Sequence, residues 1–292
     1  MTLKQQFKKN KIIHSTYNEF KKLKTSAEIE ITNFALDAKL KSGHTNYTKY
    51  IILSRGRSGT NFLRGMLNSN YQSICFGEIF RDFGSIGWDL PGYRKGAKRL
   101  NLIQNEPEQF LEKYVFRTYP EIIKSIGFKL FYYHAQNPEW KSIWSYLQQA
   151  KDLHVIHLKR ENMLATYLST CRAHKTKVWE NKSNKLERNE PMILEYEGCL
   201  EFFEKTKEFE IQTDDFFKGS KKLDISYEDL SENTNEEMKR VQSFLGMDYS
   251  PIKSRNYKQS VTPLSEGIKN YAELKAKFGH TPWSGLFEVQ TE

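Results

Sequence analysis

A short segment rich in glycine and arginine could bind an anion. The apolar run Tyr50–Leu53 is followed at residues 54–60 by Ser-Arg-Gly-Arg-Ser-Gly-Thr, and an apolar pattern of helical period comes next. A loop between a strand and a helix directs backbone N–H groups and the helix N-terminus at one point, which suits a phosphate or a sulfate. The sequence therefore predicts an anion-binding loop, with these binding residues: Arg57, Ser58, Gly59, Thr60 and Asn61.

The loop differs from the common nucleoside-triphosphate loop. That motif reads G-x-x-x-x-G-K-[ST] and uses its lysine for the β- and γ-phosphates. Here Gly56 and Gly59 are close together, and Arg57 stands where a lysine would be expected. Two plainer readings stay open at this point: an ordinary glycine turn for the loop, and a surface position for Arg55.

A second cationic segment follows a later strand. Residues 154–158 read as a buried strand, with Lys159 and Arg160 at its carboxyl end and a helical pattern after it. Ligands of open α/β sheets gather outside the carboxyl ends of the strands. Arg160 and, on the next helix, Ser169 are therefore predicted to reach one phosphate together. Taken alone, Arg160 would fit a solvated cation at a helix start equally well.

Together these segments resemble the sulfotransferases that use 3′-phosphoadenosine-5′-phosphosulfate (PAPS) and release 3′-phosphoadenosine-5′-phosphate (PAP). Residues 57–60 are similar to their 5′-phosphosulfate loop, and the string from Arg160 through Ser169 to Trp179 is similar to their 3′-phosphate segment. The pattern resembles in particular the bacterial carbohydrate sulfotransferases of the nodulation-protein H and trehalose-sulfotransferase type. This resemblance covers residues 49–280 and leaves residues 1–48 without a counterpart.

The resemblance implies in-line transfer of a sulfuryl group from PAPS to an acceptor hydroxyl on a carbohydrate. It implies that Arg57 stabilises the leaving phosphate and that Glu78, in Phe-Gly-Glu-Ile-Phe, is the general base. Apolar neighbours predict a raised pKa for Glu78, which would suit a base near neutral pH. Cytosolic aryl and steroid sulfotransferases use a histidine after a comparable strand, so His134 is a rival base and the choice stays open.

Several further assignments stay open in the sequence. Lys129 either contacts the bridging oxygen or the acceptor, or is structural, and either Trp179 or Phe76 could stack on adenine. The acceptor could instead be a small-molecule natural product, sulfated on oxygen or nitrogen. No metal is expected, because His, Asp and Glu show no ligand spacing. A nucleotide kinase, and a protein that binds RNA or another anion without catalysis, are the alternatives from other classes.

Alternation of strands and helices predicts an α/β fold: a P-loop-like three-layer α/β/α arrangement around a central parallel sheet. The strands are expected near residues 49–53, 73–76, 127–132, 154–158 and 223–227. The helices are expected near residues 59–69, 107–124, 140–150, 162–174, 197–209, 234–245 and 263–278. Two irregular stretches, 80–106 and 175–191, are predicted to bind the acceptor or close over the donor.

The N-terminal residues are more basic than the rest of the chain. The chain has 292 residues and a net charge of +9. Residues 1–24 hold seven lysines and one glutamate, about +6. We predict a basic helical N-terminal extension, residues 1–48, and a sulfotransferase domain, residues 49–292. Residues 1–24 are expected to pack on the domain edge, with a peripheral membrane or oligomer contact as the alternatives.

The same composition bears on the compartment. The sequence shows no apolar run long enough for a membrane span and no signal-peptide pattern at its N-terminus. Its three cysteines form no C-x-x-C motif. These features predict a cytoplasmic protein. An aromatic content of 14% argues against a disordered chain.

Overall fold

A five-stranded parallel sheet forms the centre of the protein. The computed structural model describes residues 27–81, 90, 92–93, 96–179, 190–251 and 262–288. The strand order is β2-β3-β1-β4-β5. The five strands lie within two residues of their predicted bounds: β1 Thr48–Ser54, β2 Ser73–Glu78, β3 Ser125–Phe131, β4 Leu153–Lys159 and β5 Lys221–Ser226.

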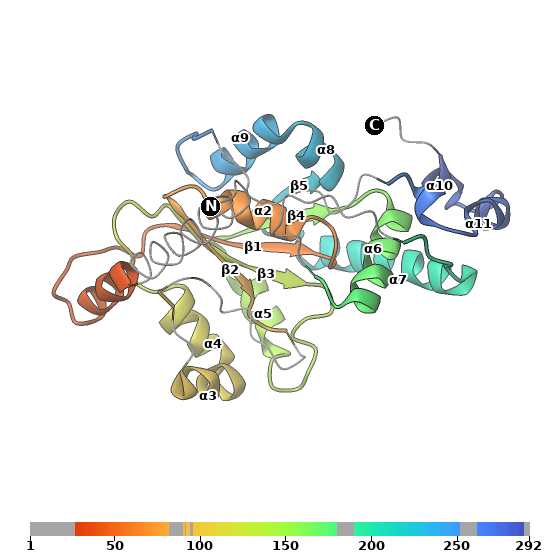
Figure 1. Ribbon diagram of the computed structural model, residues 1–292. Helices are drawn as coiled ribbons and strands as arrows, with labels where there is room; N and C mark the ends of the chain where they lie inside the picture. Colours follow the sequence, from red (N-terminus) through yellow and green to blue (C-terminus); the bar gives the residue numbers. More distant parts are fainter. Residues whose placement is uncertain are drawn as a thin grey trace, which may run out of the picture.

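The central strands are apolar because helices cover both faces of the sheet, as expected for parallel sheets. On one face, α2 (Thr60–Leu67), α8 (Tyr227–Glu232) and α9 (Thr234–Phe244) pack on Tyr50 and Ile52. The opposite face carries α3 (Ala97–Asn105), α4 (Pro107–Phe110), the π-helix η1 (Leu111–Val115) and α5 (Ser142–Gln149). Figure 1 shows these two layers above and below the sheet, so the predicted three-layer α/β/α fold is confirmed.

A third group of helices lies beyond the carboxyl ends of the strands, where the arrowheads point in Figure 1. It consists of α6 (Met163–Thr176), α7 (Tyr196–Phe216), α10 (Leu264–Gly267), α11 (Tyr271–Phe278) and the 3-10 helix η2 (Ser284–Phe287). These helices share a hydrophobic cluster of their own, which includes Leu168, Phe203 and Phe278. The arrangement holds α6 next to the edge of the sheet that was predicted to bind ligands.

Several helix predictions were wrong in extent. The helix expected at 107–124 ends at Val115, because the chain then forms a bridge between Tyr119 and His44. Pro120 also disfavours a helical conformation at Tyr119. The helix expected at 263–278 is split where Ile268 bridges to Met192. The helix expected at 197–209 continues to Phe216.

Two helices were missed. Part of the stretch 80–106, expected to be irregular, forms α3. The short helix α8 begins directly after β5, where the Ser226 side chain accepts a hydrogen bond from the backbone N–H of Asp229. Such N-terminal capping is typical of serine. The late basic residues Lys253, Arg255 and Lys258 lie outside the described residues.

The N-terminal extension is described from residue 27 onward. Residues 27–37 are helical, and Leu36 is buried. Asp37 forms an ion pair of 2.8 Å with Arg117. The lysine-rich residues 1–24 lie outside the described residues, so their predicted contacts stay predictions. No helix in the described ranges is both long and apolar enough to cross a membrane.

Candidate active site

The loop after β1 has an unusual backbone. Arg57 and Gly59 adopt left-handed conformations, with φ of 71° and 82°, and Ser58 lies between them. Left-handed φ is strained for an arginine, and such strain gathers at functional sites. A Cβ atom on Gly59 would lie 2.3 Å from the Tyr227 ring, so this position requires glycine. The alternating conformation and the start of α2 at Thr60 make the loop suited to binding an anion.

The structure brings Arg57, Arg160 and Ser169 together. Arg57 Nε donates to Ser169 Oγ at 3.0 Å, and Arg57 Nη1 donates to the backbone carbonyl of Trp179. Arg160 Nη1 donates to the Arg57 carbonyl at 3.2 Å. The loop and the segment after β4 therefore form one continuous cationic site rather than two separate pockets.

Arg160 is placed by its neighbours at the starts of α8 and α6. Its guanidinium carbon lies 4.7 Å from the centre of the Tyr227 ring, a cation–π contact. Asn162 caps α6 by accepting from the Ala165 N–H at 2.9 Å, which fixes the turn between Arg160 and Ser169. Arg160 Nε is buried and has no hydrogen-bond partner among the described residues. Burial also lowers the pKa of Arg160.

Glu78 lies at the end of β2, opposite Lys129 of β3. The register shifts between Phe76 and Glu78, and a shift of this kind re-aims a side chain. Lys129 Nζ contacts Glu78 Oε1 at 3.0 Å and also donates to Asn61 Oδ1. Lys129 is 2% exposed and Glu78 is half-buried, so the ion pair is largely shielded from water. Lys129 thereby joins Glu78 to the first turn of α2.

The predicted rise in the pKa of Glu78 is wrong. Burial does favour the neutral carboxylic acid, but the charge and hydrogen bond of Lys129 oppose it, with smaller effects from His134 and Arg81. The balance leaves the pKa of Glu78 below its ordinary value. Glu78 is therefore ionised at neutral pH.

His134 lies beside Glu78 but is held by the backbone. Its Nδ1 accepts a hydrogen bond from the Phe131 N–H at 3.2 Å. This places the proton of the neutral ring on Nε2, which is 3.9 Å from Glu78 Oε2. Burial lowers the pKa of His134 to about 4, and Lys129 contributes in the same direction. The ring is therefore neutral at physiological pH.

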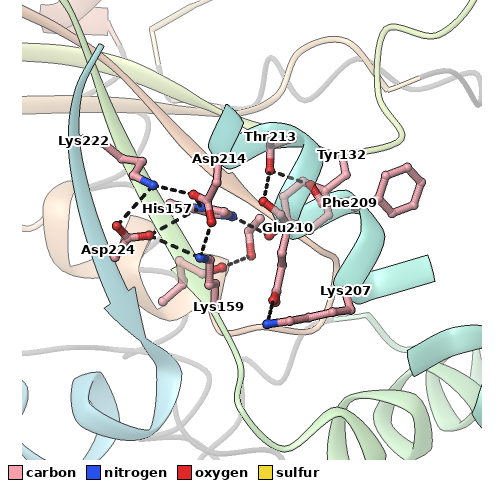
Figure 2. A network of polar contacts seen from close by, with 12 residues as sticks. Tyr132, His157, Lys159, Lys207, Phe209, Glu210, Thr213, Asp214, Lys222 and Asp224 are labelled. Atoms are coloured by element: carbon pink, nitrogen blue, oxygen red, sulfur yellow. Dashed lines mark hydrogen bonds and ion pairs between the residues drawn. The ribbon is translucent and has the colours of Figure 1, made fainter. Parts of the chain in front are cut away.

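Figure 2 shows a second charged cluster, centred on Asp214 of α7. Among the described residues, His157, Asp214 and Asp224 form one group close enough to share a metal ion. Lysines already hold these carboxylates: Lys159 lies 2.8 Å from Asp214 and 3.4 Å from Asp224, and Lys222 pairs with both. Two ammonium groups in these positions make the group a poor fit for a metal cation.

Sequence comparison agrees with the geometry. The model of the sulfotransferase family matches residues 50–251. The chain belongs to the sulfotransferase family. Nodulation protein H of Rhizobium meliloti is 25% identical over 249 residues, which cover 83% of this chain and 96% of that protein. Nodulation protein H of Rhizobium tropici is 27% identical over 247 residues, with coverage of 82% and 93%.

A solved structure is also similar to this sulfotransferase. The sulfotransferase from Alicyclobacillus acidocaldarius has a TM-score of 0.45 and 13% identity, covering 79% of this chain and 90% of its own. The expected sulfotransferase family and enzyme class are confirmed by the family match and the nodulation protein H relatives.

The strand order sets the layout of the site in this sulfotransferase. Across the carboxyl edge come Glu78 after β2, His134 after β3, the loop after β1, Arg160 after β4 and Tyr227 after β5. Parallel strands lie about 4.8 Å apart, so β2 and β4 are separated by roughly 14 Å. Glu78, the candidate base, and Arg160, a candidate for binding the 3′-phosphate, therefore lie on opposite sides of the anion-binding loop.

Sequence reasoning missed two aromatic residues of the site. Tyr227 lies under Gly59 and against Arg160. Tyr133 is 40% exposed, and its Oη lies 2.6 Å from where a Cβ on Gly56 would be. Tyr227 follows β5 directly and Tyr133 is the second residue after β3, and these positions were the available signal. Phe76 is fully buried in the core, so it does not fit the adenine-stacking role, whereas Trp179 is 40% exposed.

Proposed function

We propose that this sulfotransferase moves the sulfuryl group of PAPS in line onto a hydroxyl of a carbohydrate and releases PAP. The observation that carries the proposal is the contact of Arg57 with Ser169 and of Arg160 with the Arg57 carbonyl. Arg57, Arg160 and Ser169 thus lie at one edge of the sheet. Together they suit the 5′-phosphosulfate and the 3′-phosphate of one donor. Membership of the sulfotransferase family supports PAPS as the donor.

The loop would bind the 5′-phosphosulfate. Backbone N–H groups of Ser58, Gly59 and Thr60, together with Arg57, would stabilise the charge that grows on the leaving phosphate. Asn61 is held by Lys129 and would orient the first turn of α2. Arg160 and Ser169 would bind the 3′-phosphate, and the unpartnered Nε of Arg160 is suited to a phosphate oxygen.

Glu78 is the better candidate for the general base. It is ionised at neutral pH and can accept the proton of an acceptor hydroxyl. The Nδ1 of His134 already accepts a backbone hydrogen bond, and its Nε2 carries the proton. His134 would instead orient Glu78 or the acceptor. The ammonium of Lys129 keeps the carboxylate ionised and would also donate to a sulfuryl oxygen.

The acceptor class rests on the resemblance to carbohydrate sulfotransferases and on one exposed aromatic ring near the proposed base. Tyr133 is 40% exposed. Aromatic faces of this kind suit the apolar faces of sugar rings. The charged groups around the loop allow the transfer to proceed without a metal. Three free cysteines favour a reducing compartment, which supports the cytoplasm.

A thermal-shift titration tests the donor. PAP at about 100 times its dissociation constant should stabilise the fold by about 2.7 kcal/mol. ATP with Mg²⁺, the ligand of the kinase alternative, should give a smaller shift. Arg160→Ala should weaken PAP binding, whereas Arg240→Ala, on the surface of α9, serves as the matched control. Stabilisation by ATP–Mg²⁺ without any response to PAP would contradict the proposal.

A further inference from the structure

Arg55, the first arginine of the loop, is half-buried and has one buried donor atom without a partner in the part of the chain that the structure describes. Its guanidinium carbon lies 3.8 Å from the centre of the Phe202 ring on α7. Its Nη1 is buried and has no hydrogen-bond partner among the described residues. Leaving a charged donor unpaired in a buried position is costly, so such a group calls for an explanation.

The neighbours of Arg55 do not supply that partner. Glu210 of α7 is the nearby carboxylate, and it forms an ion pair of 3.5 Å with Lys207. Tyr132, also nearby, hydrogen-bonds to His157 at 2.7 Å. The cation–π contact with Phe202 fixes the plane of the guanidinium but satisfies none of its N–H groups. The structure thus orients Arg55 and leaves Nη1 available.

The position of Arg55 indicates which part of a ligand it would meet. It immediately precedes Gly56, whose backbone lies against the Tyr133 hydroxyl. Tyr133 follows β3, and its ring adjoins that of His134, which lies 3.9 Å from Glu78. Arg57 extends toward Ser169. The guanidinium of Arg55 packs on Phe202 of α7, and Gly56 and Tyr133 link Arg55 to the side of the loop that holds the proposed base. The sulfuryl group would pass from donor to acceptor on the side of the loop that holds the proposed base.

We propose that Arg55 is a further catalytic residue whose Nη1 donates to an oxygen of the sulfuryl group during transfer. This inference rests on the proposed function. In the step, the bond from sulfur to the donor phosphate oxygen breaks and a bond from sulfur to the acceptor oxygen forms. The acceptor proton goes to Glu78, and the electron pair of the broken bond stays on PAP. Arg55 exchanges no proton and holds the negative oxygens of the moving group.

The test measures binding of inorganic sulfate to the enzyme saturated with PAP, so that it requires no knowledge of the acceptor. Arg55→Met keeps an unbranched side chain over Phe202 and removes the charge. We expect this variant to bind PAP as the wild type does and to bind sulfate about 10- to 100-fold more weakly, the effect of one charge-assisted hydrogen bond. PAPS turnover should fall with little change in the donor KM.

Two further variants complete the design. Arg55→Lys keeps the charge without the planar fork and should retain part of the sulfate affinity, which also covers the case in which Arg55→Met fails to fold. Arg117→Met is the matched control, because Arg117 Nε is another buried donor with no partner among the described residues. Arg117 pairs with Asp37, away from the loop, so its loss should affect stability and leave sulfate binding unchanged.

The outcomes separate this inference from the proposed function. Undiminished sulfate binding in Arg55→Met, with PAP still bound, would overturn the role of Arg55 alone. An equal loss of PAP affinity would show that Arg55 binds the 5′-phosphate instead, and would also overturn it. If PAP fails to bind the wild-type protein, the proposed function falls and the inference falls with it.

Discussion

Two clusters of charge lie next to each other at the carboxyl edge of the sheet, and they differ in how far they are neutralised. In the cluster of Figure 2, Asp214 pairs with Lys159, Lys222 and His157, so that the cations have carboxylates beside them. Around the loop, Arg55 and Arg160 each keep a buried donor atom that no described residue satisfies. A buried donor without a partner among the described residues also occurs away from the loop, at Arg117, so what distinguishes the loop is that two such donors, Arg55 and Arg160, lie close to it.

The boundary between the two clusters falls between consecutive residues of the chain. Lys159 ends β4 and reaches the carboxylates of Asp214 and Asp224. Arg160 follows it and contacts Arg57 and Tyr227. Side chains alternate between the faces of a strand, so neighbouring residues serve different layers. Lys159 thereby stabilises the scaffold, while Arg160 is our candidate for binding the ligand.

The largest expected effect lies in the loop cluster. Glu78→Gln keeps the shape of the side chain but removes the base, and should lower the rate of sulfuryl transfer by about 10²- to 10⁴-fold. His134→Gln, the matched change at the rival position, should have a much smaller effect. The measurement is kcat with saturating PAPS. A large loss in His134→Gln together with a small one in Glu78→Gln would identify histidine as the base.

Acidic pH should lower the stability of the protein through the cluster of Figure 2. Burial lowers the pKa of His157 to about 4, and the Lys159 charge adds to this, against an ordinary value of 6.5. The unfolded chain therefore binds a proton between these two pH values that the folded chain does not. Burial of the neutral His157 ring costs no stability above pH 6.5. As the pH falls from 6.5 toward 4, the free energy of unfolding decreases by up to about 3 kcal/mol.

Urea unfolding at several pH values measures this effect. His157→Gln should show a shallower loss of unfolding free energy between pH 6.5 and 4 than the wild type. His134 has a similarly lowered pKa, so His134→Gln is a natural companion variant. Equal slopes for His157→Gln and the wild type would contradict the prediction.

A smaller effect is expected from Asp214→Asn. The change removes the carboxylate that Lys159, Lys222 and His157 share, but the Asp214 side chain is 33% exposed, so water compensates in part. We expect a loss of about 1–2 kcal/mol in unfolding free energy, with turnover of the folded enzyme unchanged. A collapse of activity in a folded Asp214→Asn variant would mean that the two clusters are functionally coupled.

The sequence predicted the five strands well, because buried parallel strands read as apolar runs with polar residues at their ends. It also placed Arg57 and Arg160 at the same edge, since carboxyl ends of parallel strands share an edge, but it did not predict the contact of Arg57 with Ser169. The pKa of Glu78 could not be predicted, because its pairing with Lys129 depends on β2 lying next to β3. The order of strands is a tertiary property that no local pattern contains.

The missed residues have a similar explanation. Tyr133 and Tyr227 act through contacts with glycines that are distant in the chain, Gly56 and Gly59. Helix α8 has six residues, too few to show a clear helical period. The roles of the site residues, including Arg57 and Glu78, stay predictions that the variants above can test.

The alternation of Lys159 and Arg160 also limits how β4 can evolve. Deleting or inserting one residue within the strand would turn each following side chain to the opposite face. The lysine would then face the loop, the arginine would face two aspartates, and both layers would lose their charge matching at once. The length of β4 is therefore under a tighter constraint than the identity of any one of its residues.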